Sequence, residues 1–201
     1  MLIKDLALAR RNSQHWGTQT VKILSTAKRA GLVAWLLVHL GAVALADDDL
    51  VVQDQGHHTL KTYTIEQLRS QFAQAELDTP TPWTKRGSTL RYRGPALLDV
   101  LAQSGLRQIA SVEVNASDGF AANIKMDEIE RYSPILALEV ACSPSEVAQS
   151  ECAAPGDYRP LRAEEYGPLF LLWPLNRMPA SYSPQRNSLW VWFVNGLRAD
   201  R

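Results

Sequence analysis

The stretch Ser-Val-Glu-Val-Asn-Ala-Ser-Asp-Gly-Phe-Ala-Ala-Asn-Ile-Lys-Met-Asp, residues 111–127, decides the fold of this chain. Apolar and other residues alternate on both sides of Asp118-Gly119, so the stretch predicts two strands joined by a Gly-containing turn. Asn115 and Asp118 lie where the chain reverses, between strands that would hold them rigidly. Polar groups on a loop that is fixed by strands often serve in binding. We therefore expect this hairpin to line a site.

Short helices and apolar strands flank the hairpin. Predicted strands cover residues 57–63, 90–93, 134–140, 167–174 and 189–194, the last of them closed by Asn195-Gly196, and residues 75–82 run extended into Trp83. Predicted helices begin at a Thr64 capping box, at Gly94-Pro95 and at a capping-box-like start at Asp127. Short helices scattered among mostly non-alternating strands indicate an α+β fold with a mixed β-sheet.

Residues 1–46 have the organisation of a secretory signal peptide. Lys22, Lys28 and Arg29 precede an uncharged, mostly apolar run at residues 31–43, and Ala44-Leu45-Ala46 supplies the small residues of a cleavage site. We expect cleavage after Ala46 and a periplasmic or secreted product. The alternative is an uncleaved anchor, although the apolar run is short of the roughly 20 residues that a membrane span requires.

Two further expectations concern the start of the chain. Residues 1–20 resemble neither a signal peptide nor a domain, which indicates that translation starts later, near Val21. Residues 47–57 are acidic and polar, so we expect a flexible N-terminus ahead of one domain at residues 58–201. His57 and His58 are adjacent, and neighbouring side chains of a strand point to opposite faces, which favours a solvated end over a metal site.

The balance of charge argues against nucleic acid as a partner. Residues 47–201 carry 15 basic and 20 acidic side chains, whereas nucleic-acid binding requires clustered Lys and Arg. Hydrophobic residues make up 46% of the chain, which is enough for a proper core. No membrane span is expected after signal cleavage.

Cys142 and Cys152, with nine residues between them, are the two cysteines of the chain. In an oxidising compartment this pair predicts a disulfide. The bond would staple an insertion at residues 142–165 and contribute about 2–3 kcal/mol. A metal or redox pair is the alternative, but it lacks the C-x-x-C spacing and further ligands.

Common catalytic motifs are absent from the sequence. It contains no G-x-G-x-x-G, no P-loop, no H-E-x-x-H and no G-x-S-x-G. The two histidines of the mature chain lie at its start, so a Ser-His-Asp or Cys-His arrangement is not expected. Adjacent acids such as Glu164-Glu165 are typical of a solvated surface. We assign neither a catalytic residue nor a metal ligand.

Seven segments follow one another in a characteristic order. They are Thr64–Phe72, Pro82-Trp83-Thr84, Arg93–Leu101, Val114–Phe120, Ile135–Ala137, Gly167–Pro174 and Leu189-Trp190-Val191. This succession, across residues 58–198, resembles the molybdopterin-binding domain of the sulfite oxidase family in its small, exported, single-domain version. The resemblance implies a compact α+β fold with a mixed sheet, and a pocket that in the enzymes holds a molybdenum–pterin cofactor.

Three departures from that family pattern concern the cofactor. The catalytic members place a metal-ligating Cys after the extended segment that here runs Leu77–Trp83, and this segment has no Cys. Phe170 stands where the family tends to have Arg, and Leu189 stands where it usually has Lys. Because a soft thiolate fixes the metal, the resemblance implies a domain that has lost its metal anchor.

The candidate pocket combines aromatic and polar residues, as concave binding sites usually do. Its expected residues are Trp83, Asn115, Asp118, Gly119, Phe120, Tyr166, Arg177 and Tyr182. Plainer interpretations stand beside this one: Trp83 and Trp173 as core residues, Asp118-Gly119 as a turn only, and Arg177 as a solvated loop residue. We expect Trp190 and Trp192 to point to one face and to pack on the sheet.

Three functional hypotheses remain open at this point. The first is an exported domain of the sulfite-oxidase-like fold that binds a small molecule or an envelope partner protein and performs no redox chemistry. The second is an oxidoreductase that retains molybdopterin through non-covalent contacts, with Asn115 and Asp118 near the cofactor. The third is a protein-interaction module that uses residues 143–165.

Overall fold

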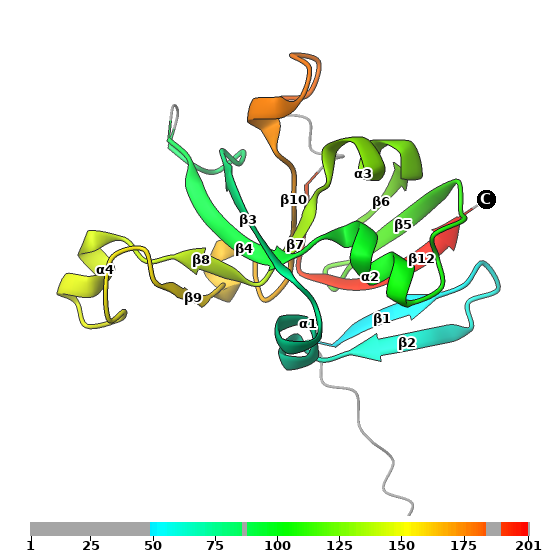
Figure 1. Ribbon diagram of the computed structural model, residues 1–201, viewed down its shortest axis with the longest axis horizontal. Helices are drawn as coiled ribbons and strands as arrows, with labels where there is room; N and C mark the ends of the chain where they lie inside the picture. Colours follow the sequence, from blue (N-terminus) through cyan, green and yellow to red (C-terminus); the bar gives the residue numbers. More distant parts are fainter. Residues whose placement is uncertain (1–48, 86–87, 184–189, 201) are drawn as a thin grey trace, which may run out of the picture. The chain divides into compact units, whose positions relative to one another are not determined.

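The structure is a computed structural model that describes residues 49–85, 88–183 and 190–200. The expected signal peptide, the expected start near Val21 and the departure at Leu189 lie outside these residues. The described part has an α+β fold with twelve strands in three sheets and four short α-helices (Figure 1). Within it, no helix has the length and hydrophobicity that a membrane span would need.

The largest sheet has five strands and a mixed pattern. Its order is β2 (Thr59–Tyr63), β1 (Leu50–Gln53), β12 (Val194–Asp200), β5 (Ser111–Ala116) and β6 (Ala121–Lys125). β1 runs parallel to β12, and the other neighbours are antiparallel. The predicted hairpin is confirmed as β5 and β6, with Gly119 in the turn at a φ of 86°, a conformation that glycine adopts without strain.

Two smaller sheets complete the fold. One has the order β3 (Gln74–Thr79), β4 (Leu90–Pro95), β8 (Glu139–Ala141) and β9 (Tyr158–Pro160), and the other has the order β11 (Val191–Trp192), β10 (Phe170–Leu172) and β7 (Ile135–Ala137). The single strand predicted at residues 134–140 is therefore wrong, because the chain changes sheets at Leu138. The Leu138 N–H donates to the carbonyl of Arg93 at 2.9 Å, and its carbonyl accepts from the Leu161 N–H at 2.9 Å.

The helices are short and lie against the sheets. They are α1 (Ile65–Gln71), α2 (Leu97–Gln103), α3 (Met126–Tyr132) and α4 (Pro144–Ala148), with 3₁₀ turns η1 (Ala163–Glu165) and η2 (Leu175–Arg177). The Thr64 capping box is confirmed: Gln67 N–H donates to Thr64 Oγ1 at 3.1 Å, and Gln67 Oε1 accepts from Thr64 N–H at 2.9 Å.

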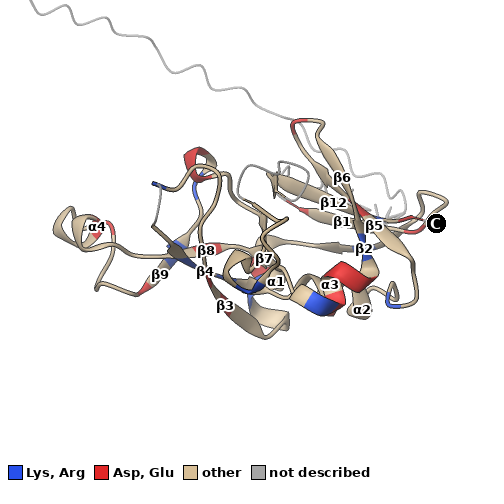
Figure 2. Cartoon of the chain, turned by 90° about the horizontal axis from the view of Figure 1, so that it is seen from above, with Lys and Arg blue, Asp and Glu red and all other residues tan. Residues whose placement is uncertain are grey.

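The capping box expected at Asp127 is wrong. α3 begins at Met126, and its N-cap Lys125 makes no capping hydrogen bond with its side chain. Asp127 and Glu128 instead lie in the first turn and Arg131 in the last, as the colours of α3 in Figure 2 show. This order of charges favours the helix, because the N-terminal end of a helix carries partial positive charge and the C-terminal end partial negative charge.

Both ends of the domain differ from the expectation. Residues 50–53, expected to be flexible, form β1, in which Leu50 and Val52 are completely buried. At the other end the predicted strand 189–194 is wrong. Phe193 adopts a positive φ of 53° and separates β11 from β12, so that Asn195-Gly196 continues the second strand instead of closing the first.

Gly94 belongs to β4, where the expected helix start is wrong; α2 begins at Leu97 with Ala96 as its N-cap. A Cβ atom at position 94 would lie 1.9 Å from the carbonyl oxygen of Leu136 in β7. Real side chains do not approach backbone so closely, so β4 can cross β7 only with glycine at this position. The crossing brings the two smaller sheets together.

We therefore predict that Gly94→Ala destabilises the fold by about 2–4 kcal/mol, because the backbone contact with Leu136 must open. Urea unfolding monitored by tryptophan fluorescence measures the change. Gly196→Ala is the matched control, since its added Cβ would meet only side-chain atoms of Asn115, the nearest at 3.3 Å. A Gly94→Ala protein as stable as the control would contradict the close approach.

Candidate functional site

The segment after β3, where the family resemblance places a metal-ligating Cys, is a tight turn held by threonine hydroxyls. Thr81 N–H donates to Thr84 Oγ1 at 2.9 Å, and Thr84 Oγ1 donates to the carbonyl of Thr81 at 2.9 Å. Before the turn, the buried Thr79 hydroxyl donates to the carbonyl of Trp173 at 2.6 Å. The turn presents Trp83, whose side chain is 41% exposed, so its interpretation as a core residue is wrong. Trp173 is fully buried, which confirms the same interpretation there.

Aromatic rings connect Trp83 to the opening hairpin. Ring centroids lie 4.3 Å apart for Trp83 and Tyr166, and 4.8 Å apart for Trp83 and Trp192. Trp192 also stacks on Phe120, at 6.1 Å with an interplanar angle of 3°. Its Nε1 donates to Asp118 Oδ2 at 3.1 Å. Trp192 therefore bridges the turn at Trp83 and the turn of the hairpin.

Trp83 and Tyr166 also line an open cleft of about 500 Å³. Its remaining lining residues come from the segment between β3 and β4, from β4, from β8 and from the segment around η1: Thr81, Thr84, Lys85, Ser88, Leu90, Tyr92, Val140, Leu161, Glu164 and Glu165. The volume lies within the range of about 300–1,000 Å³ that is usual for ligand pockets. Burial raises the pKa of Tyr92 to about 12, so its phenol is neutral at physiological pH.

The structure groups the expected pocket residues only in part. Of the eight, Trp83 and Tyr166 line the cleft. Asp118 and Phe120 instead contact Trp192. Asn115 lies beside Gly196, where an added Cβ would be 3.3 Å from Asn115 Cβ.

Two further residues of the expected pocket, Arg177 and Tyr182, do not line this cleft. Arg177 is an exposed residue of η2, as the plainer interpretation held. Tyr182 packs on Tyr132, with 5.5 Å between ring centroids, and its hydroxyl donates to Glu128 Oε1. Both contacts tie Tyr182 to α3 and away from the cleft.

Asp118 and Gly119 form the turn of the hairpin. Asp118 Oδ1 accepts from the Phe120 N–H at 3.0 Å, and its other oxygen accepts from Trp192. Both oxygens of the Asp118 carboxylate therefore accept hydrogen bonds from the protein itself. A Cβ added at Gly119 would have no neighbour within 4 Å.

Sequence reasoning missed Trp192 and the cleft residues other than Trp83 and Tyr166. The expected packing on the sheet is confirmed for Trp190, which is completely buried and lies 6.2 Å from Phe170 of β10 between ring centroids. Trp192 is half-buried and also contacts Trp83, a contact that was not expected. The repeated threonines at positions 81 and 84 were a usable signal for the turn. No comparable signal in the sequence indicated the partners of Trp192, because Asp118 is 74 residues away in the chain.

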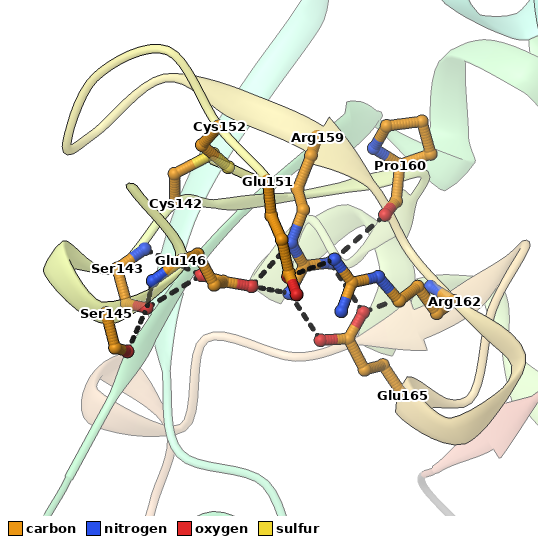
Figure 3. A network of polar contacts seen from close by, with 10 residues as sticks. All are labelled: Cys142, Ser143, Ser145, Glu146, Glu151, Cys152, Arg159, Pro160, Arg162 and Glu165. Atoms are coloured by element: carbon orange, nitrogen blue, oxygen red, sulfur yellow. Dashed lines mark hydrogen bonds and ion pairs between the residues drawn. A yellow bond between two sulfur atoms is a disulfide. The ribbon is translucent and has the colours of Figure 1, made fainter. Parts of the chain in front are cut away.

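Glu165 forms part of the wall of the cleft. A network of polar contacts holds it in place within residues 142–165, which we call the disulfide-bonded arm (Figure 3). Arg159 Nη1 donates to Glu165 Oε2 at 2.6 Å, and Arg159 Nε donates to Glu146 Oε1 at 2.6 Å. Partial burial opposes the ionisation of Glu165, but the hydrogen bonds from Arg159 and from the Arg162 N–H keep its pKa below the usual value. The expectation that Glu164-Glu165 is simply solvated is therefore wrong for Glu165.

Glu146 connects this network to the disulfide. The Cys142–Cys152 bond is confirmed, with 6.2 Å between the Cα atoms. Ser143, the next residue, caps α4 and donates its N–H to Glu146 Oε2 at 2.7 Å. That hydrogen bond and those from Arg159 lower the pKa of Glu146 to about 2 against the cost of burial. Glu146 therefore holds Arg159 in position, and the hydrogen bonds from Arg159 hold Glu165 in the wall of the cleft.

The residues present do not fit a thiolate-anchored molybdenum centre. Both cysteines of the chain are joined to each other in the arm, and threonine hydroxyls occupy the turn where a thiolate would be needed. Among the described residues, no three His, Cys, Asp or Glu side chains form a group that could hold a metal ion. Trp192 fills the space between that turn and Asp118.

No protein-family model matches the sequence, and no curated protein matches it either.

We predict that Glu146 makes stability depend on acid pH. Its folded pKa of about 2 lies below the ordinary value of 4.5, so its contribution is present above about pH 4.5 and is lost as the pH falls through about 2. The free energy of unfolding of Glu146→Gln should fall less steeply over this range than that of the wild type. Over this range we expect the difference between the two free energies of unfolding to change by on the order of 1 kcal/mol.

Glu151→Gln is the matched control from the same arm. Side-chain exposure is 35% for Glu151 and 39% for its partner Arg162, against 17% for Glu146 and 12% for Arg159. An exposed ion pair contributes little, so this variant should follow the wild-type slope in denaturant titrations at stepwise lower pH. Parallel slopes for wild type and Glu146→Gln would contradict the assigned role.

Proposed function

We propose that this chain is an exported ligand-binding domain with the sulfite-oxidase-like fold, and that it binds a small, largely apolar molecule at the cleft beside Trp83. One observation carries the proposal: a large aromatic ring, 41% exposed, is held by a threonine turn at a cleft of about 500 Å³. Exposed aromatic rings on rigid supports are typical of binding sites, because they offer contact area with little loss of entropy.

The lining of the cleft supports an apolar ligand. Leu90, Val140 and Leu161 provide aliphatic contacts, while the hydroxyl groups of Thr81 and Thr84 are already used within the turn. A ligand would therefore gain mainly from contact with the ring and the aliphatic side chains. Buried apolar surface contributes about 25 cal/mol per Å².

The proposal of binding without redox chemistry rests on the residues that would have to anchor a cofactor. The family enzymes use a thiolate, and here the corresponding turn offers threonine while both cysteines form a disulfide. Export is proposed from the organisation of residues 1–46. The disulfide is consistent with an oxidising compartment.

Two leucines provide a matched pair for testing the cleft. Leu90 is 44% exposed and lines the cleft, whereas Leu60 is 39% exposed and lies on β2. We predict that Leu90→Ser weakens the binding of small aromatic compounds such as indole about fivefold, and that Leu60→Ser leaves it unchanged. Saturation-transfer NMR titrations measure both. Equal affinities for the two variants would overturn the assignment of the cleft.

Cofactor analysis tests the other half of the proposal. Protein exported by a host that makes molybdopterin should contain molybdenum and fluorescent pterin at far below one equivalent per chain, since no thiolate anchors the metal. A family enzyme that has the cysteine, produced in the same host, shows that cofactor was available. Stoichiometric molybdenum in this protein would overturn the proposal in favour of a redox enzyme.

A further inference from the structure

Two opposite charges at the cleft have no partner within the described part of the protein. Lys85 and Glu164 both line the cleft and are both exposed, and neither side chain forms an ion pair or hydrogen bond there. The neighbouring acid Glu165 differs, because Arg159 neutralises it through hydrogen bonds of 2.6 Å and 2.5 Å. The cleft therefore offers a ligand one free ammonium group and one free carboxylate.

The apolar part of the cleft lies with these charges in the same cavity. Trp83, Leu90 and Leu161 line it together with Lys85 and Glu164, within about 500 Å³. The Trp83 ring packs against Tyr166, with 4.3 Å between ring centroids, and meets Trp192 in a T-shaped contact, so the ring is held in place while 41% of the residue stays exposed. A ligand that satisfies all of these groups has an apolar body and both signs of charge.

We propose that the cleft binds a zwitterion with a large apolar side chain, namely an aromatic or branched amino acid or a short peptide that ends in one. The ligand carboxylate pairs with Lys85, its ammonium group pairs with Glu164, and its side chain packs on Trp83. This inference rests on the proposed small-molecule function and names the ligand class for that site. Both ion pairs are exposed, so each contributes modestly and weakens with added salt.

The test combines truncated ligands with single substitutions. Isothermal titration calorimetry compares phenylalanine with phenethylamine, which lacks the carboxylate, and with 3-phenylpropionate, which lacks the ammonium group. Against wild type, each truncation should weaken binding about threefold to tenfold. Lys85→Ala should weaken phenylalanine similarly but leave phenethylamine unchanged, and Glu164→Gln should leave 3-phenylpropionate unchanged.

Charged residues away from the cleft serve as controls. Lys61→Ala on β2 and Glu130→Gln on α3 remove one exposed charge of each sign, and they should leave all three affinities at wild-type values. A comparison of phenylalanine with the dipeptide glycyl-phenylalanine separates the two sources of the ligand. Tighter binding of either one supports the proposal and assigns its source.

Two results would overturn the ligand class. Equal affinity for phenylalanine and both truncated compounds, unchanged by Lys85→Ala and Glu164→Gln, would show that the charges play no part, while the cleft would still bind apolar molecules. No binding of any of the three compounds would also overturn it. In that case the indole titrations of Leu90→Ser and Leu60→Ser decide separately whether the cleft is a small-molecule site.

Discussion

Packing of the Trp83 and Trp192 rings joins the three sheets at one place. Trp83 follows β3, Trp192 ends β11, and Phe120, which stacks on Trp192, follows the turn of the five-stranded sheet. Backbone hydrogen bonds run beside the rings: the Phe193 N–H donates to the Tyr166 carbonyl at 3.2 Å. Aromatic pairs contribute about 0.5–1.5 kcal/mol each beyond their buried area.

That packing also determines what kind of site this fold can offer here. The resemblance to molybdopterin-binding domains led to the expectation of a pocket between the hairpin and residues 79–83. Trp192 lies here instead: its ring contacts that of Trp83, and its Nε1 donates a hydrogen bond to the carboxylate of Asp118. The open cleft is lined instead by Trp83 together with residues of β4, β8 and η1. The proposed function of ligand binding therefore uses the loop that would carry the metal anchor, but through an aromatic ring.

The disulfide-bonded arm has a structural task in this arrangement. Arg159 holds Glu146 on one side and Glu165 on the other, with only 12% of its side chain exposed. Removing such charges from water is costly, so the network adds little net stability. What it provides is position: the carboxylates place the segment of η1 that forms one wall of the cleft. A free insertion of this length would not hold that wall.

Local features of this protein were accessible from the sequence alone. The Thr64 capping box, the hairpin turn at Asp118-Gly119 and the Cys142–Cys152 pair each involve residues within about ten positions of one another, so their energetics are local. Composition and the apolar runs indicated the α+β class and the mixed sheet. Even so, the same runs misplaced the boundaries. Nothing in residues 134–140 marks Leu138 as the point of transfer between sheets, because every residue there is buried.

Tertiary structure alone decided the cleft and its supports. The glycine at position 94 is required by a carbonyl of Leu136, and β1 is a strand because β12, near the other end of the chain, lies beside it. Trp192 meets Asp118 across 74 residues, and Arg69 meets Glu139 across 70. Periodicity describes which face of an element is apolar, but it carries no information about which distant element covers that face. The sequence by itself therefore determined the hairpin, the Thr64 cap and the disulfide, and only the packing of the three sheets determined where a ligand can bind.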